Sequence, residues 1–341
     1  MDWLLKDVAK GVVKNISVEF LLNRAVTRSE QRDYQGAIED YNQVLSINPN
    51  NADAYCSRGV ILANLGEHQS AIQDYTQALR IKPFLGAAYF NRGLSRTQIR
   101  DYQRAIEDYN QALHSNPNFA FIYSNRGLTF VKIGNYKIAI QDFEQAILLD
   151  SGIPSAYYGK GLIYFYTELF LQAIESFNLA IKLYPKYIEA FYNRGLAHSY
   201  LGNFVQATED FNQILQLNPN ASCAYYGRGL VKMYLNESKE AIIEFNKSIQ
   251  IDPCYVPSYL YRGYIYELGS YYKKALENYS LVVQIDANNK QAYEKRGLIR
   301  IKLCDLEGGI QDLNKAANIF LSQGNVDDYE RILKTIRDVE I

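Results

Sequence analysis

Large apolar, small and polar positions follow one another along this chain in a pattern that repeats every 34 residues. The pattern is anchored by a glycine that recurs without insertion or deletion, at Gly59, Gly93, Gly127, Gly161, Gly195, Gly229, Gly263 and Gly297. An aromatic residue precedes each glycine by four positions: Tyr55, Tyr89, Tyr123, Tyr157, Phe191, Tyr225, Tyr259 and Tyr293. Such a fixed period predicts an array of equal structural units rather than one globular core.

Within each unit a second set of positions marks a second helix. An alanine follows the glycine by twelve residues, at Ala71, Ala105, Ala139, Ala173, Ala207, Ala241 and Ala275, and Gly309 takes this place in the last unit. A ring follows each alanine by four, at Tyr75, Tyr109, Phe143, Phe177, Phe211, Phe245 and Tyr279. Small residues let two antiparallel helices approach closely, while the rings fill the space between neighbouring helices. Prolines end most units, because proline cannot continue a helix: Pro49, Pro83, Pro117, Pro185, Pro219 and Pro253.

This pattern of aromatic, Gly, Ala, aromatic and Pro residues resembles the tetratricopeptide repeat family. The sequence motifs Asn-Arg-Gly and Ile-Glu-Asp-Tyr are similar to those of bacterial, especially cyanobacterial, repeats. The resemblance implies an all-α fold, a right-handed superhelical solenoid of helix-turn-helix repeats. We expect nine tandem repeats over residues 18–323, at 18–51, 52–85, 86–119, 120–153, 154–187, 188–221, 222–255, 256–289 and 290–323. The first and last are degenerate, with Leu21, Ala25, Gly309 and Leu313 at key positions, as is usual for units that face water.

The two ends carry helical patterns of their own. Residues 1–17 have an apolar face opposite three lysines, which predicts either a capping helix or an amphipathic helix that lies on a membrane surface. Residues 324–341 predict a C-terminal capping helix with an apolar face, and Asn325 can cap its start: Val326, Tyr329, Ile332, Leu333, Ile336 and Val339.

Composition removes several function classes. The net charge is -1 and there is no long basic run, so we expect no nucleic-acid partner. No phosphate-binding glycine loop, nucleophile motif or metal-ligand cluster is present, so we expect no enzyme, no cofactor and no metal. The four cysteines are scattered without the paired spacing of a disulfide framework or a zinc site. We expect them to be small buried residues in a reducing compartment: Cys56, Cys223, Cys254 and Cys304. Without a secretory signal or an apolar run of about 18 residues, a cytoplasmic location is the default.

A charged position accompanies each repeat glycine. The residue before the glycine is basic, and an acidic or amide residue usually follows it by sixteen positions, as in Arg58 and Asp74 or Arg194 and Asp210. Where lysine replaces the arginine, at Lys160, serine also replaces the acid, at Ser176. We expect salt bridges within each repeat, because arginine pairs with carboxylates in a bidentate way. The alternative is a basic stripe that binds a carboxylate or phosphate ligand.

The resemblance implies that the first helix of each repeat lines a concave groove. Repeats five to seven then present Tyr-Leu-Tyr on one helix face, and large apolar patches usually meet a partner. The candidate groove residues are Phe90, Leu94, Tyr158, Leu162, Tyr166, Tyr192, Leu196, Tyr200, Tyr226, Leu230 and Tyr234. The alternative is that these rings pack mostly on one another.

Some solenoids of the family that the chain resembles hold a ligand's backbone amides with asparagines two residues before the glycine or its counterpart, and here these are Asn23, Asn91, Asn125 and Asn193. The alternative is that they are interface polar groups satisfied by water or by neighbouring side chains. The carboxylate clamp of the family's chaperone-tail receptors is not expected, since its places hold Leu22, Val26, Cys56 and Val60.

These observations favour a non-enzymatic scaffold or adaptor that binds a protein or peptide segment in its groove. The alternative is a membrane-associated assembly factor that docks through residues 1–17, which would make the protein peripheral to a membrane. Self-association as a homodimer stays open, because an open groove or an exposed cap can pair.

Overall fold

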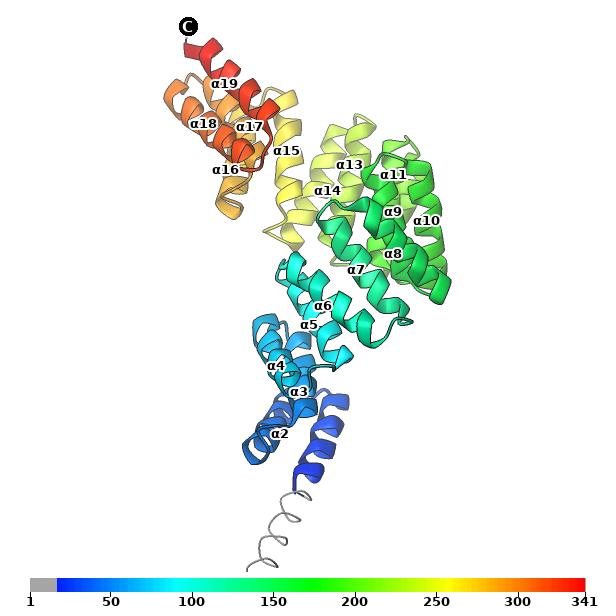
Figure 1. The fold of residues 1–341 in the computed structure, drawn as a ribbon. Coiled ribbons are helices and arrows are strands. Elements are labelled where there is room, and N and C mark those ends of the chain that lie inside the picture. Colours follow the sequence, from blue (N-terminus) through cyan, green and yellow to red (C-terminus); the bar gives the residue numbers. More distant parts are fainter. Residues whose placement is uncertain (1–16, 341) are drawn as a thin grey trace, which may run out of the picture. The chain divides into compact units, whose positions relative to one another are not determined.

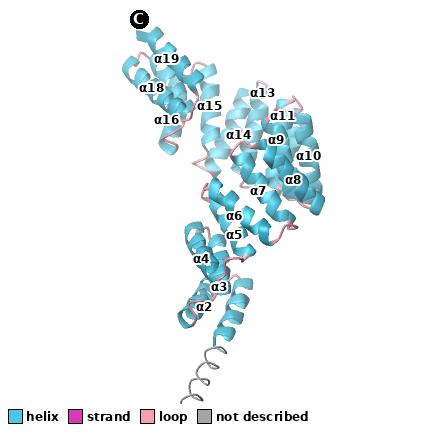
Figure 2. Cartoon of the chain, viewed as in Figure 1, coloured by secondary structure: helices cyan, strands magenta, loops and turns pink. Residues whose placement is uncertain are grey.

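The computed structural model describes residues 17–340, and every regular element in that range is an α-helix (Figure 2). A helix over residues 17–30 is followed by α2 (Tyr34–Ile47), α3 (Ala52–Asn64), α4 (His68–Ile81), α5 (Gly86–Gln98), α6 (Tyr102–Ser115), α7 (Ala120–Lys132), α8 (Tyr136–Leu149) and α9 (Pro154–Tyr166). The chain continues through α10 (Phe170–Leu183), α11 (Ile188–Tyr200), α12 (Phe204–Leu217), α13 (Ser222–Tyr234), α14 (Ser238–Ile251), α15 (Val256–Leu268), α16 (Tyr272–Ile285), α17 (Lys290–Lys302), α18 (Leu306–Ser322) and α19 (Val326–Glu340) (Figure 1).

The helices form two compact units, one up to Thr167 and one from Glu168 onward. Within each unit the helices form antiparallel pairs, and α5 against α6 or α13 against α14 are examples of the pairs in closest contact. The expected all-α array of helix-turn-helix repeats is confirmed. Residues 1–16 lie outside the described part of the chain, so the two interpretations of that segment stay predictions.

The core is a series of clusters between successive helices. The aromatic residue of each second helix is fully buried, together with the alanine that precedes it by four: Tyr75, Tyr109, Phe143, Phe177, Phe211, Phe245 and Tyr279. At the C-terminal end, Ile332 and Ile336 of α19 pack against Leu313 and Phe320 of α18. The Asn325 side chain accepts a hydrogen bond from the Asp328 amide, which caps α19. The apolar face of α19 therefore covers the last repeat.

Most repeat glycines lie directly against the buried ring of their own second helix, whereas Gly297 faces Gly309 and Leu313. A Cβ atom added at Gly93 would stand 2.8 Å from Tyr109 Cε1, and one at Gly127 would stand 2.7 Å from Phe143 Cε1. No real side chain tolerates that separation, so the ring can occupy this position only if the facing residue is glycine. The predicted close crossing of the two helices is confirmed, and it depends on this contact.

The turn between the two helices of a repeat needs a left-handed residue. Glycine supplies it at Gly66, Gly134 and Gly202, and Gly324 does the same between α18 and α19, with φ between 76° and 82°. Six other turns use residues with a Cβ at φ values of 59° to 66°: Arg32, Arg100, Glu168, Asn236, Ser270 and Cys304. Left-handed backbone costs a residue with a Cβ roughly 1–2 kcal/mol, so these six turns are strained relative to the glycine turns.

Two cysteines depart from the sequence interpretation. Cys254 and Cys304 are exposed, whereas Cys56 and Cys223 are half-buried. Cys304 occupies the left-handed turn position just described, and Cys254 lies in the connection between α14 and α15. Turn residues of this kind face solvent, so the expectation that all four cysteines are buried was wrong.

Replacing Gly93 by alanine should destabilise the protein by about 1–3 kcal/mol, because the new Cβ forces Tyr109 out of its position. The sign of the stability change tests the contact, because Gly→Ala inside an unobstructed helix stabilises a protein by about 1 kcal/mol. Urea unfolding followed by circular dichroism measures the change. In a Tyr109→Leu background the same substitution should cost less, and a stabilising effect in the wild-type background would contradict the proposed contact.

Replacing Arg100 by glycine should stabilise the protein by about 0.5–1 kcal/mol, because relief of left-handed strain exceeds the added chain entropy. The reverse change at the equivalent turn, Gly66→Arg, should destabilise it by a similar amount. Thermal unfolding of both variants checks the pair, and equal shifts in the same direction would show that backbone conformation is not the cause.

Candidate functional site

The first helices of neighbouring repeats contact one another and form what we call the inner wall. The contacts join α3 to α5, α5 to α7 and α7 to α9 in the first unit, and α11 to α13 and α13 to α15 in the second. The candidate groove residues all lie on these helices. Each unit of the wall is described separately below.

In the first unit most candidates are only partly accessible. Phe90 and Leu94 pack against the cluster around Tyr109, and the Phe90 ring lies 6.1 Å from the Tyr109 ring. Tyr158 and Leu162 are likewise half-buried. Tyr166 differs, because 54% of its surface is exposed.

In the second unit the candidates divide into buried and exposed sets. Tyr226 and Leu230 are buried, and the Tyr226 ring lies 5.6 Å from both Tyr255 and Tyr261. Tyr192 and Leu196 are half-buried in the neighbouring core. Tyr200 and Tyr234 remain exposed by 56% and 41%. In this unit, therefore, the tyrosine three residues before the glycine packs on its neighbours, and the one five residues after it offers contact area.

Burial raises the pKa of several tyrosines that pack between these helices. Burial raises the pKa of Tyr192 far above its usual value, and its hydroxyl donates a hydrogen bond to Tyr255. Burial likewise raises the pKa of Tyr226, whose hydroxyl donates to Tyr261. For Tyr255 burial raises the pKa to about 12. These side chains are neutral near pH 7 and hold the repeats together.

Each exposed tyrosine is held by a ring from the preceding second helix. Tyr166 stacks on Tyr136 with centroids 6.1 Å apart, and Phe170 and Tyr200 stack at 5.0 Å. Phe204 and Tyr234 stack at 6.1 Å. The partner is in every case the first residue of that helix, thirty positions earlier in the sequence. The pairs of rings thirty residues apart can be found in the sequence. The sequence interpretation missed them because it considered only the first helix of each repeat.

The structure also adds residues that the sequence interpretation left out. Leu268 and Tyr264 of α15 are exposed by 66% and 37%. Next to them lies a pocket of about 380 Å³, lined by Leu260, Tyr261, Tyr264, Tyr279, Gln291, Glu294 and Lys295. Its charges are paired. Lys295 Nζ lies 3.4 Å from a Glu267 oxygen, and Glu294 accepts a 2.6 Å hydrogen bond from Arg331 of α19.

The asparagines are placed less favourably for a ligand than the sequence suggests. The Asn125 amide nitrogen donates to the Phe121 carbonyl at 2.8 Å, and Asn193 donates to Glu189 in the same way. Asn91 is half-buried and Asn23 is exposed. At least two of the four asparagines therefore donate a side-chain hydrogen bond to a backbone carbonyl of their own helix.

The charged ladder is formed within the repeats, as expected. Arg58, Arg194 and Arg296 bind Asp74, Asp210 and Asp312 at 2.6, 2.5 and 2.6 Å, and the acids are buried. Repeat eight keeps the contact as an amide, with Arg262 Nε donating to Asn278 at 2.9 Å. In repeat five Lys160 instead faces Glu144 of the preceding repeat at 3.7 Å.

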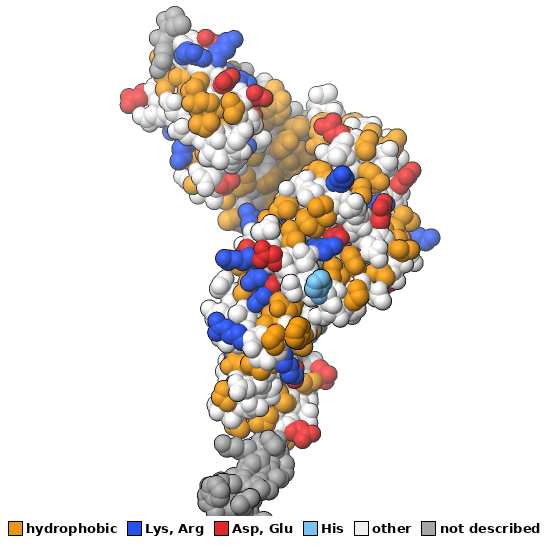
Figure 3. Space-filling view, in the orientation of Figure 1, with side chains coloured by type: hydrophobic (Ala, Val, Ile, Leu, Met, Phe, Trp, Pro, Cys, Tyr) orange, Lys and Arg blue, Asp and Glu red, His pale blue; other side chains and the backbone are white. Residues whose placement is uncertain are grey.

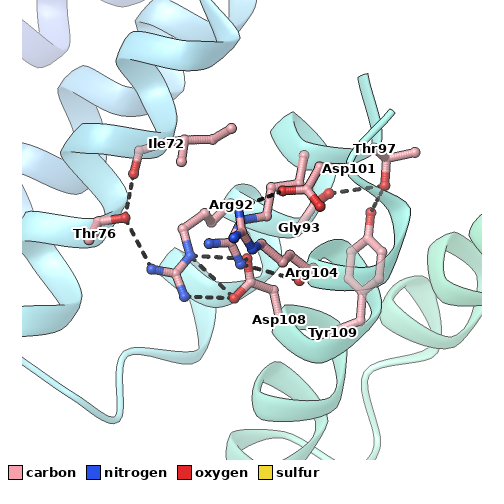
Figure 4. A network of polar contacts seen from close by, with 10 residues as sticks. Ile72, Thr76, Arg92, Gly93, Thr97, Asp101, Arg104, Asp108 and Tyr109 are labelled. Atoms are coloured by element: carbon pink, nitrogen blue, oxygen red, sulfur yellow. Dashed lines mark hydrogen bonds and ion pairs between the residues drawn. The ribbon is translucent and has the colours of Figure 1, made fainter. Parts of the chain in front are cut away.

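The arginines also connect neighbouring repeats. Figure 4 shows Arg92 between Asp108 of its own repeat and the Thr76 hydroxyl of the preceding one. An asparagine accepts the equivalent bond from Arg126 and Arg194, at Asn110 and Asn178. Most of these arginines also lie over the aromatic ring three residues earlier, at 5.3–5.5 Å. Their charge is therefore used inside the fold. On the face drawn in Figure 3, basic side chains alternate with acidic, polar and apolar ones.

Across residues 17–340 no three His, Cys, Asp or Glu side chains are grouped so that they could hold a metal ion. Within the same range, no helix combines the length and apolar character needed to cross a bilayer.

Removing one ladder arginine should be costly. Arg194→Ala leaves Asp210 buried without its cation, and we expect a loss of about 3–5 kcal/mol in unfolding free energy. The double variant Arg194→Ala with Asp210→Ala should recover part of that loss, because no charge is then stranded. Urea unfolding of the two variants measures this. A double variant less stable than the single one would refute the stranded-charge explanation.

Sequence profiles of the tetratricopeptide repeat match most of the chain. They cover residues 30–66, then 52–85, 86–119 and 188–221, then 124–188 and 224–253. No curated protein matches the chain.

Among solved structures, a tetratricopeptide repeat protein from Parabacteroides merdae is 22% identical, with a TM-score of 0.59 over 69% of this chain and 93% of the other. A chain of the APC/C hetero-tetramer Cut9-Hcn1 is 14% identical, with a TM-score of 0.60 over 93% of this chain and 76% of the other. At these identities the similarity shows the fold alone.

Proposed function

We propose, since this chain belongs to the tetratricopeptide repeat family, that it is a non-enzymatic scaffold whose inner wall binds a segment of a partner protein. Proteins built from these repeats serve as protein-binding scaffolds, and the choice of partner depends on side chains outside the repeat framework. The observation that carries the proposal is the pair of stacked tyrosines Tyr200 and Tyr234, which stay exposed at equivalent positions of the second unit. Tyr166 shows the same arrangement within the first unit.

Stacked, exposed tyrosines are suited to binding. A tyrosine buries a large area and has few rotatable bonds, so ordering it on binding costs little entropy. Here the stacking partners Phe170 and Phe204 already restrict the rings before a partner arrives. Preorganisation of this kind raises affinity, because the ordering cost is met during folding.

The charges near the wall support a partner held by apolar and hydrogen-bonded contacts. The ladder arginines are engaged with buried acids, and Lys295 is paired with Glu267. A strongly anionic partner would have to compete for cations that the fold already uses. We therefore expect binding to depend weakly on salt.

The double variant Tyr200→Ala with Tyr234→Ala should lose at least about tenfold in affinity, or about 1.4 kcal/mol, for peptides selected on the wild-type protein from a random library. Fluorescence anisotropy with the selected peptides measures it. The matched control is Leu179→Ala with Tyr184→Ala, which removes two side chains of similar exposure, one on the second helix of repeat five and one in the connection that follows.

The control variant should bind like the wild type. Equal binding by all three proteins would show that the selected peptides dock elsewhere, and equal losses in both variants would point to a general effect on folding. Tyr192→Ala is a poorer test, because Tyr192 is part of the packing between repeats.

A further inference from the structure

Three equivalent positions in the second unit stay open to solvent, and we call them the exposed row. They are Tyr200, Tyr234 and Leu268, the last residues of α11, α13 and α15, exposed by 56%, 41% and 66%. These three helices contact each other in sequence along the inner wall. The row is thus a strip of apolar side chains with one member on each of three adjacent helices.

The spacing of this strip selects among peptide conformations. Packed helices lie about 8–10 Å apart, so a ligand running along the row must present a side chain at about that interval. A β-strand repeats a face every two residues, roughly 6.6 Å, which falls short. A polyproline II helix has three residues per turn and a 3.1 Å rise, so it repeats every ~9.3 Å. One residue in three of a polyproline II segment therefore meets each member of the row.

Hydrogen bonding separates this ligand from an α-helix, in which residues seven apart also lie about 10.5 Å apart. An α-helix satisfies its own backbone groups, whereas polyproline II leaves every carbonyl free to accept. The row itself carries hydroxyl donors, because Tyr200 and Tyr234 are both exposed. Burial raises the pKa of Tyr234, so its hydroxyl stays protonated.

The row is negative at its first end. The exposed Glu168 stands two residues before Phe170, whose ring stacks on Tyr200 with centroids 5.0 Å apart. Burial raises the pKa of Tyr200, and Tyr261 and Glu168 add to this shift. A basic residue at the matching end of the ligand would pair with this carboxylate. The charge gives the ligand a direction along the row.

We propose that the exposed row binds a proline-rich segment in the polyproline II conformation, with a basic residue beside Glu168. The inference rests on the proposed function and specifies its ligand class. Proline rings pack against the stacked tyrosines, and the tyrosine hydroxyls donate to the carbonyls of the segment. Polyproline II is already ordered before binding, so little entropy is lost.

The test uses a fluorescent peptide of about nine prolines preceded by two lysines, which gives one turn for each member of the row. Comparison peptides of equal length and charge replace the prolines by a Gly-Ser sequence or by a helix-forming Ala-rich sequence. By anisotropy at low salt, the proline peptide should bind at least about tenfold more tightly than either comparison peptide. A Gly-Ser peptide that binds equally well, or a helical peptide that binds better, would overturn the inference.

Variants locate the contact. Tyr234→Ala should weaken binding of the proline peptide at least about tenfold, and Tyr234→Phe by a smaller factor that reports the hydroxyl. Glu168→Gln should weaken binding of the lysine-bearing proline peptide but not of the same proline peptide without lysines, and added salt should abolish that difference. Tyr184→Ala, which removes a tyrosine of similar exposure outside the row, should have no effect. Circular dichroism confirms that each variant is folded.

The two proposals fail differently. If library-selected peptides depend on Tyr200 and Tyr234 while the proline peptide does not bind, the wall binds peptides and the polyproline II inference is wrong. If neither kind of peptide depends on these tyrosines, the inner wall is not the binding surface and both proposals fall.

Discussion

The contact between the repeat glycine and the buried ring sixteen residues later is the constraint on which the rest of the structure depends. The ring fills the space that a Cβ would need, as with Gly93 and Tyr109, so the two helices of a repeat cross at one fixed point. Because that point recurs every 34 residues, the orientation of each first helix about its axis is set before its surface is considered. The framework thereby decides which positions face a neighbour and which face solvent.

Electrostatics follow the same framework. In most repeats an arginine beside the glycine reaches the buried acid next to the ring. A second nitrogen of that arginine can reach the preceding repeat, as in Arg194 with Asp210 and Asn178. A buried acid needs a partner to offset desolvation, and a planar guanidinium can serve two acceptors at once. The arginines thus join adjacent repeats within each unit. At the ends of α11, α13 and α15, the side chains that stay exposed on the wall are the uncharged Tyr200, Tyr234 and Leu268.

The sequence alone predicted the features that repeat. The helix pairs, the close crossing and the arginine-acid ladder all follow from equal spacing, and the structure confirms each. Which tyrosines are buried was not predictable in the same way, because it depends on contacts between repeats. Tyr226 is covered by Tyr261, a residue two places before the next repeat glycine, where another repeat has asparagine. The stacking of Tyr200 on Phe170 joins residues thirty apart, a spacing that is not the repeat period.

The position five residues after the glycine lies on the inner wall, and its residue differs from repeat to repeat. The crossing contact does not involve it, and its side chain is free to differ: Gln98, Lys132, Tyr166, Tyr200, Tyr234, Leu268 and Lys302 in successive repeats. If these residues served only to fill the core, their size and polarity would be confined as they are at Tyr75, Tyr109 and Phe143. A position that the fold leaves open, and that carries large rings held by a second ring in three consecutive repeats, has the properties of a recognition surface. In such an array, binding specificity depends on side chains that take no part in the contact between glycine and ring. These side chains can change while the fold stays the same.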